Sequence, residues 1–106
     1  MSLLDKFSLR GKNALISSPE YVYGPEIAIG LAEAGANVWL CGECTKSLDE
    51  VAAQMEKAGY KAAGKIEYHQ GTAESAVELA DKVRKELKTL DIFVENGNNV
   101  PTTGWA

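Results

Sequence analysis

The stretch ALISSPEYVYGPEIAIGLAEAGANVWL, residues 14–40, decides the fold. It begins and ends with short apolar runs of the length of a buried strand, and between them apolar residues recur at helical spacing. Pro25 suits the first turn of that helix, and Gly35 suits the position after its last turn. The stretch therefore predicts a strand over 13–17, a helix over 25–34 and a second strand over 37–40, which is the βαβ unit that joins parallel strands.

The rest of the chain continues this alternation. Ser47 to Glu50 has the form of a capping box, and the helix that it predicts ends at Gly59. A weaker third strand is predicted over 65–69. Thr72 then caps a long helix, and a fourth strand is predicted over 90–94. The residues of the long helix that are predicted to face inward are Ala76, Val77, Ala80, Val83 and Leu87.

The predicted element order is βαβαβαβ, which indicates an α/β fold with a parallel sheet, right-handed crossovers and helices on both faces. A doubly wound fold of this Rossmann-like kind has two halves that meet at a crevice. We therefore predict an incomplete fold, the first half plus the fourth strand, in a single truncated domain over residues 1–106 with a loop-like tail over 98–106. The fourth strand is then an uncovered apolar edge of the sheet.

The composition narrows the class of protein. The chain has 106 residues, 45% of them hydrophobic and 25% charged, with a formal net charge of -4, a balance typical of a globular domain. A negative charge without a dense cluster of Lys and Arg argues against nucleic acid as a partner. No apolar run approaches the roughly 20 residues of a membrane span. Two cysteines agree with a reducing compartment, so the cytoplasm is the expected location.

Three segments carry a resemblance to a known family. FSLRGKNALIS (7–17) is similar to the entry into the first strand of the short-chain dehydrogenase/reductases. AIGLAEAGANVWLCGE (28–43) is similar to their first helix and second strand, and LDIFVENGN (90–98) to their fourth strand. The resemblance covers nearly the whole chain. It implies a dinucleotide-binding fold and a place among the NAD(P)-dependent oxidoreductases.

The loop after the first strand departs from the pattern of that family. The family has Thr-Gly-x-x-x-Gly-x-Gly, and residues 17–24 align with it without a gap, but Ser18 and Val22 stand where two of the three glycines belong. Glycines give that turn a permissive backbone and let a pyrophosphate reach the helix N-terminus. Val22 crowds this approach, and Glu20 and Glu26 place carboxylates where the helix dipole would attract phosphate.

The other contact points that the resemblance implies also differ. Glu43 follows the second strand where NADP-preferring relatives commonly have Arg; a carboxylate there repels a 2′-phosphate but accepts hydrogen bonds from a ribose diol. Gln70-Gly71 replaces Asp-Val after the third strand, and only Asn96 matches the Asn-Asn-Ala-Gly after the fourth. The candidate cofactor-binding residues, in degenerate form, are Ser17, Ser18, Tyr21, Val22, Gly24, Glu43 and Asn96. We expect no bound cofactor, and NAD rather than NADP if one binds.

The residues that the resemblance implies for catalysis do not occur in this sequence. The family's Ser and Tyr-x-x-x-Lys belong to the second half of its fold, and no tyrosine here has a lysine four positions later. Hydride transfer to a carbonyl needs such a proton donor. We therefore predict a chain that is non-catalytic alone, a degenerate subunit that associates with a full-length homologous dehydrogenase or with a separately encoded carboxyl-terminal half. The alternative is the cofactor-binding half of a longer NAD-dependent oxidoreductase.

A thiol redox module is a second alternative. Cys41 and Cys44 form a Cys-x-x-Cys pair between a predicted strand and a predicted helix, where a helix N-terminus would favour a thiolate. Against this alternative, the capping box puts the helix start at Ser47, after both cysteines. No metal site is predicted, because His69 is the only histidine and the sequence has no further cysteine.

Overall fold

The computed structural model describes residues 8–20, 23–68 and 72–96. Its strands are β1 (Asn13–Ser17), β2 (Asn37–Gly42), β3 (Gly64–Glu67) and β4 (Ile92–Glu95). Its helices are α1 (Gly24–Glu33), α2 (Thr45–Lys57) and α3 (Ala73–Glu86). The predicted order βαβαβαβ is confirmed. The tail predicted over 98–106, together with Tyr21, Val22 and His69, lies outside the described residues.

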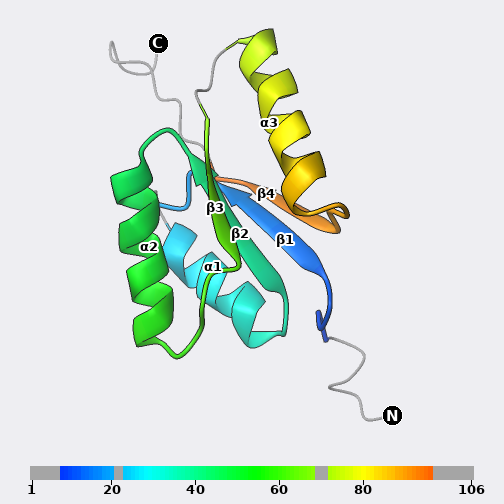
Figure 1. Ribbon diagram of the computed structural model, residues 1–106. Coiled ribbons are helices and arrows are strands. Elements are labelled where there is room, and N and C mark those ends of the chain that lie inside the picture. The colour runs from blue at the N-terminus through cyan, green and yellow to red at the C-terminus, as the bar shows by residue number, and fades with distance from the viewer. Residues whose placement is uncertain (1–7, 21–22, 69–71, 97–106) are drawn as a thin grey trace, which may run out of the picture.

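The four strands run parallel in one sheet with the order β3-β2-β1-β4 (Figure 1). The chain leaves β1 toward β2 and β3 on one side and then returns to the other side of β1 with β4. Ser17 at the end of β1 pairs in register with Cys41 of β2 and with Glu95 of β4. The carboxyl ends of three strands therefore meet at the point where the strand order reverses.

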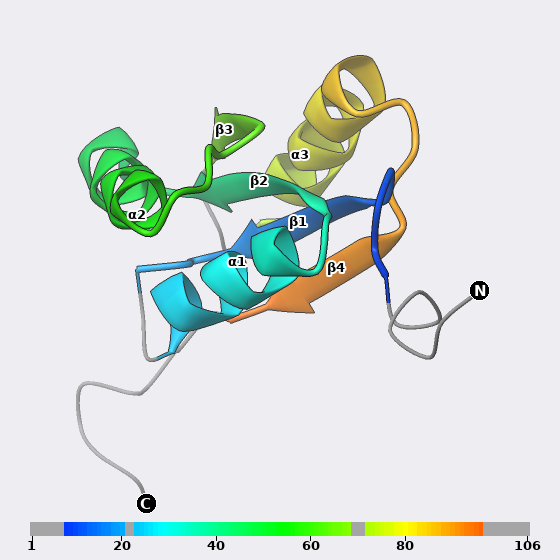
Figure 2. The same cartoon turned by 90° about the horizontal axis from the view of Figure 1, so that it is seen from below.

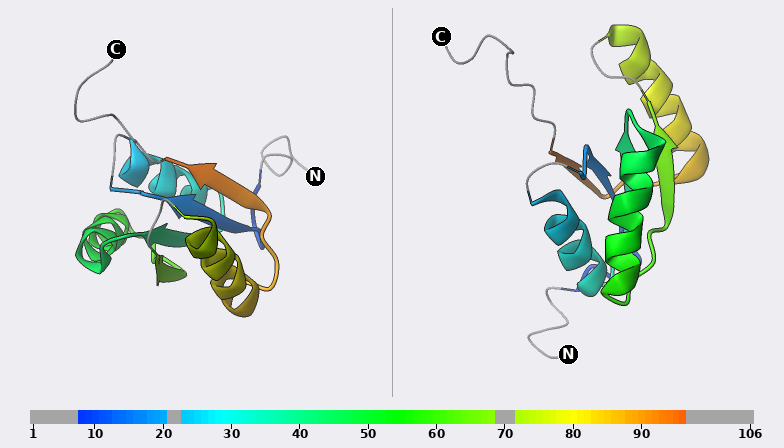
Figure 3. Two further views of the ribbon diagram at one scale, coloured as in Figure 1. Left: turned by 90° about the horizontal axis from the view of Figure 1, so that it is seen from above. Right: turned by 90° about the vertical axis from the view of Figure 1, so that its left-hand side faces the viewer.

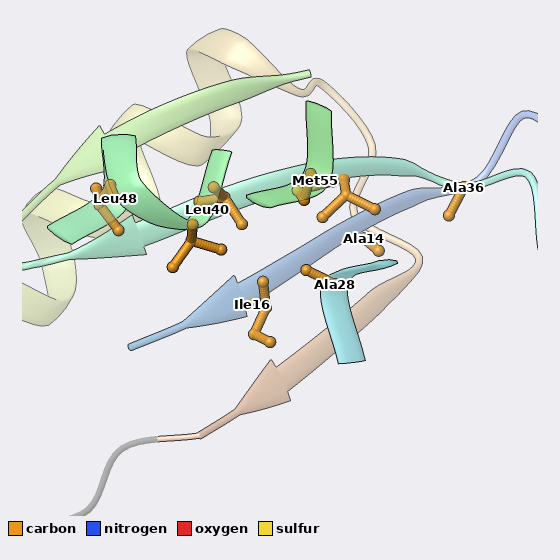
Figure 4. Packing of buried hydrophobic residues seen from close by; sticks show 9 residues of the cluster. Ala14, Ile16, Ala28, Ala36, Leu40, Leu48 and Met55 are labelled. Carbon is orange, nitrogen blue, oxygen red and sulfur yellow. The ribbon is translucent and has the colours of Figure 1, made fainter. Parts of the chain in front are cut away.

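Helices cover both faces of the sheet: α1 and α2 lie on one face and α3 on the other (Figures 2 and 3). Because side chains alternate along a strand, each face has its own core. The core under α1 and α2 contains Ala14, Ile16, Ala28, Ala36, Val38, Leu40, Leu48, Val51 and Met55 (Figure 4). The core under α3 contains Leu15, Cys41, Ile66, Tyr68 and Leu87.

The start of α2 differs from the prediction. The helix begins at Thr45 with Cys44 as its N-cap residue, so the cap predicted at Ser47 is wrong by three residues. Leu48 N–H already donates to Cys44 O at 3.1 Å. The Thr45 hydroxyl donates to the Glu67 carboxylate at the end of β3, which holds this first turn against the sheet. The position of the helix start is therefore decided by a strand that is distant in sequence.

The cap of α3 agrees with the prediction, but its inward face does not. Thr72 and Ser75 form a reciprocal capping box in which Ser75 N–H donates to Thr72 Oγ1 at 3.0 Å. Leu87 is buried and Val83 is partly buried, whereas Val77, predicted to face inward, is 62% exposed. Ala76 and Ala80 are exposed as well. The helix thus contacts the sheet along a narrow line that includes Leu79 and Val83.

Asn13 fastens the start of β1 to the turn between α3 and β4. Its side-chain amide donates to Thr89 O at 2.9 Å and to Leu87 O at 3.3 Å. Its backbone N–H donates to Asp91 Oδ2 at 2.9 Å. These bonds join residues more than 70 positions apart, so they help to fix the register in which β4 enters the sheet.

Candidate functional site

The carboxyl ends of β1, β2 and β4 form the candidate site. In open parallel sheets, ligands bind outside the carboxyl ends of the strands at the point where the strand order reverses. That point lies here between β1 and its two neighbours, β2 and β4. The loop between β1 and α1 therefore borders the crevice in which a nucleotide would be held.

Ser18 has a left-handed backbone conformation of the kind that glycine usually adopts. Its φ is +50°, in the left-handed region that side chains disfavour, at a cost of roughly 1–2 kcal/mol for a residue with a Cβ. Ser18 N–H donates to Cys41 O at 2.8 Å, which ties the loop to the end of β2. The turn that a glycine normally allows is thus retained.

Gly24 is buried where only a glycine fits. A Cβ added to it would lie 1.9 Å from Pro19 O, far inside any real contact. The first turn of α1 is therefore pressed directly against the backbone of the loop. Tyr23, the N-cap residue of α1, is 72% exposed, and its φ of +62° completes the turn.

Ser17, Glu95 and Asn96 link the ends of β1 and β4. The Ser17 hydroxyl donates to Glu95 Oε1 at 2.7 Å. The Asn96 side-chain amide donates to Ser18 O at 3.3 Å, and Asn96 N–H donates to Ser17 O at the same distance. The structure therefore brings together Ser17, Ser18, Gly24 and Asn96 of the predicted site. Asn96 acts here as a brace for the loop backbone.

Two carboxylates lie near the end of β2. Glu43 is exposed, whereas Glu20 Oε1 is buried and accepts no hydrogen bond from the described residues. A buried polar atom without a partner costs roughly 1–3 kcal/mol. A Cβ on Gly42 would be 3.8 and 3.9 Å from the two carboxylate oxygens of Glu20. Glu20, expected from the sequence to act at the start of α1, thus lies against β2.

These residues suit a ribose with free hydroxyl groups better than a ribose that carries a 2′-phosphate. The conformation of Ser18 and the close approach at Gly24 keep the loop backbone of a dinucleotide cradle. Glu20 and Glu43 offer acceptors that suit ribose hydroxyls and repel a 2′-phosphate. Tyr21 and Val22 lie outside the described residues, so crowding of the pyrophosphate by Val22 stays a prediction.

The two cysteines lie in different surroundings. Cys41 is fully buried, and burial, with the charges of Glu95 and Glu20 adding to it, raises the pKa of its thiol to about 12. Cys44 is exposed, and hydrogen bonds from the backbone and side chain of Ser47 lower the pKa of its thiol. The attacking thiol of an exchange reaction must be an accessible thiolate, so Cys44 and not Cys41 could fill that role.

The described part of the chain was also considered for a metal site and for a membrane-spanning helix. Residues 8–20, 23–68 and 72–96 contain no group of three side chains able to hold a metal ion. None of the helices in these ranges is long and apolar enough to cross a membrane. The candidate site therefore consists of the strand ends and the loop that follows β1.

An apolar groove lies on the opposite side of the sheet from α1. It has a volume of about 380 Å³, and its walls come from α3 and from the α3–β4 region. Leu15 of β1 forms part of its wall. Phe93 is 49% exposed and Leu90 is 40% exposed there. Sequence reasoning predicted the uncovered strand, but not the groove, because it placed Ala76 and Ala80 inside the core.

The two edges of the sheet are not equivalent. The β3 edge carries Lys65, which forms an ion pair with Asp49, and Glu67, which accepts from Thr45. Charged side chains on an edge strand oppose pairing with another chain. The β4 edge carries Ile92, Phe93 and Val94, and no described strand pairs with its outer side. The β4 edge is thus the one suited to receive a further strand.

With this geometry, the chain can be compared with known proteins. It matches the family model described as short chain dehydrogenase over residues 12–103. It is 33% identical over 93 residues to the hydroxysteroid 11-beta-dehydrogenase 1-like protein B of Xenopus laevis, covering 88% of this chain and 32% of that protein.

Two solved structures are similar to the fold described above. A short-chain type dehydrogenase/reductase from Mycobacterium marinum is 31% identical with a TM-score of 0.78, covering 95% of this chain and 40% of that one. The RhlG/NADP active-site complex of Pseudomonas aeruginosa is also 31% identical, with a TM-score of 0.79, covering 93% of this chain and 39% of that one.

The fold and the site define a Rossmann-like chain with the loop geometry of a dinucleotide cradle. The chain belongs to the short-chain dehydrogenase family. It spans about a third of the length of the Xenopus laevis relative and 39–40% of the two solved structures. The family resemblance and the incomplete Rossmann-like fold that the sequence predicted are confirmed.

Proposed function

We propose that this chain is the nucleotide-side half of a short-chain dehydrogenase-type oxidoreductase and acts with a carboxyl-terminal half of the same family fold. The open β4 edge beside the α3 groove carries this proposal. In a doubly wound sheet the next strand pairs with β4, and the helix joining them covers the exposed face. The partner would also supply the Ser and the Tyr-x-x-x-Lys that the resemblance implies.

The geometry favours a separate half over a full-length dehydrogenase as the partner. A complete doubly wound sheet already pairs its own fourth strand with its fifth, so that fifth strand is not free to pair with β4 of this chain. A half that begins with the helix leading into that fifth strand would cover both Phe93 and the groove. The chain alone is then non-catalytic. Since both cysteines are free thiols, we place the assembly in the cytoplasm.

The test is co-expression with the part of the Mycobacterium marinum dehydrogenase that this chain does not cover. We expect a 1:1 complex by sedimentation, because that part supplies a strand for β4 and a helix for the groove. Phe93→Asp should abolish the complex by placing a charge on the apolar edge. Val77→Asp is the control, since Val77 is also an exposed apolar residue but does not line the groove.

Two outcomes would contradict the proposal. One is a complex that survives Phe93→Asp. The other is tighter association with the complete Mycobacterium marinum dehydrogenase than with its carboxyl-terminal part, which would instead favour the full-length subunit as the partner.

A second candidate function is cofactor binding, with NAD preferred over NADP. The observation that favours it is the retained loop backbone, with Ser18 at φ +50° and Gly24 against Pro19 O. A loop that had lost its ligand would have no reason to keep a strained serine in a glycine conformation. The expectation of no cofactor remains the alternative, and nucleotide titration of the chain distinguishes the two.

A further inference from the structure

Glu20 packs beside Gly42 at the end of β2. The carboxylate reaches from the β1–α1 loop to the Cα of Gly42, where a Cβ would be 3.8 and 3.9 Å from its two oxygens. The same Cβ would lie 3.3 Å from a methyl group of Leu48 in α2. The tight contact is the one with Leu48, and the contacts with Glu20 are ordinary packing distances, so the carboxylate lies directly beside the glycine.

One oxygen of this carboxylate, Glu20 Oε1, is buried and accepts no hydrogen bond from the described residues. Buried polar atoms in native proteins are almost always paired, so an exception indicates a group that a ligand or water completes. The neighbouring Glu43 is exposed. It therefore has less to gain from a ligand than Glu20.

The place of this carboxylate corresponds to a known role in dinucleotide folds. An acidic residue about 20 positions after the first loop, at the end of β2, commonly accepts a hydrogen bond from the adenosine ribose. In this chain that position is Gly42, which has no side chain. We infer that Glu20 is the ribose-binding carboxylate of this chain and that it, rather than Glu43, sets the preference for NAD over NADP.

The preference follows from charge and hydrogen bonding together. A ribose 2′-hydroxyl can donate to Glu20 Oε1 and so satisfy it. A 2′-phosphate has no such donor in its ionised form and brings a second negative charge to a partly buried carboxylate, which is unfavourable. The inference rests on the cofactor-binding candidate above, and not on the docking of a carboxyl-terminal half.

The test compares ADP-ribose with 2′-phospho-ADP-ribose, the adenosine ends of NAD and NADP, by calorimetry on the full chain. The wild type should prefer ADP-ribose. Glu20→Gln should reduce that preference by about tenfold, the size of one lost charge-assisted hydrogen bond. Glu26→Gln removes the same charge from the exposed first turn of α1 and should leave the ratio unchanged.

Glu43→Gln decides between the two carboxylates. A ratio that stays constant in Glu43→Gln and falls in Glu20→Gln supports the inference. A ratio that falls only in Glu43→Gln, or no binding of either ligand to the wild type, overturns it. Thermal unfolding checks the fold: Glu20→Gln should melt close to the wild type, because glutamine has nearly the same shape. The docking experiment contains no nucleotide, so its result is independent of this one.

Discussion

At the residue scale, the two thiols of the Cys-x-x-Cys motif have pKa values that are shifted in opposite directions. Cys41 points into the core under α3, and Cys44 is exposed at the start of α2. Sequence spacing alone cannot show this, because it depends on the face of β2 to which Cys41 belongs and on where the loop after β2 places Cys44. The burial of Cys41 makes a prediction about alkaline stability.

Cys41 should contribute stability that is lost as the pH rises above 9. Its pKa is raised from 9.0 to about 12, so the unfolded chain loses this proton first. We expect the stability advantage of the wild type over Cys41→Ala to shrink by about 2 kcal/mol between pH 8 and pH 10.5. Urea denaturation at each pH measures this difference.

Cys44→Ala is the control for that series. Because the pKa of Cys44 is lowered, the difference between the wild type and Cys44→Ala should move in the opposite direction with pH. A constant difference for Cys41→Ala across the pH range would contradict the burial of its thiol.

At the element scale, two glycines of α1 should respond oppositely to the same substitution. Gly24→Ala should lower the free energy of unfolding by about 3 kcal/mol, because its Cβ would overlap Pro19 O. Gly30→Ala should raise it by roughly 0.5–1 kcal/mol, since nothing lies within 4 Å of that Cβ and alanine favours a helix. Urea denaturation of both variants checks the pair; a neutral Gly24→Ala would contradict the close contact.

The sequence predicts elements better than it predicts their partners. The order of strands and helices and the cap at Thr72 follow from local pattern, and all are confirmed. The start of α2 does not, because Ser47 matches a capping box while the bond from Thr45 to Glu67 decides the boundary. Val77 was misplaced because helical periodicity cannot tell which part of a face the sheet covers.

The candidate site shows the same division. Ser17, Ser18, Gly24 and Asn96 were found because they occupy aligned positions next to strand ends. The contact of Glu20 with Gly42 was missed, since it joins the loop after β1 to the last residue of β2, and only the folded sheet brings these together. A glycine at the end of β2, where an acidic residue is usual, was the available signal.

At the scale of the whole molecule, helices bury one face of the sheet more completely than the other. The face under α1 and α2 has a continuous core, in which Leu48, Val51 and Met55 of α2 are buried. The other face is covered by α3 alone among the described elements, and only Ser75 within that helix is buried. The ends of α3 are nonetheless held, by the Thr72 cap and by the Asn13 bonds to the turn that follows it.

Because α3 is fixed mainly at its ends and buries little surface, its amides should exchange differently from those of α2. Amides of α3 should open at lower free energy than those of α2, a helix of nearly equal length with a buried face. Native-state exchange measured by mass spectrometry on the free chain checks the order. Equal protection of the two helices would contradict it. Added carboxyl-terminal half should slow exchange in α3 and leave α2 unchanged, so that this helix becomes a local reporter of whether the fold has been completed.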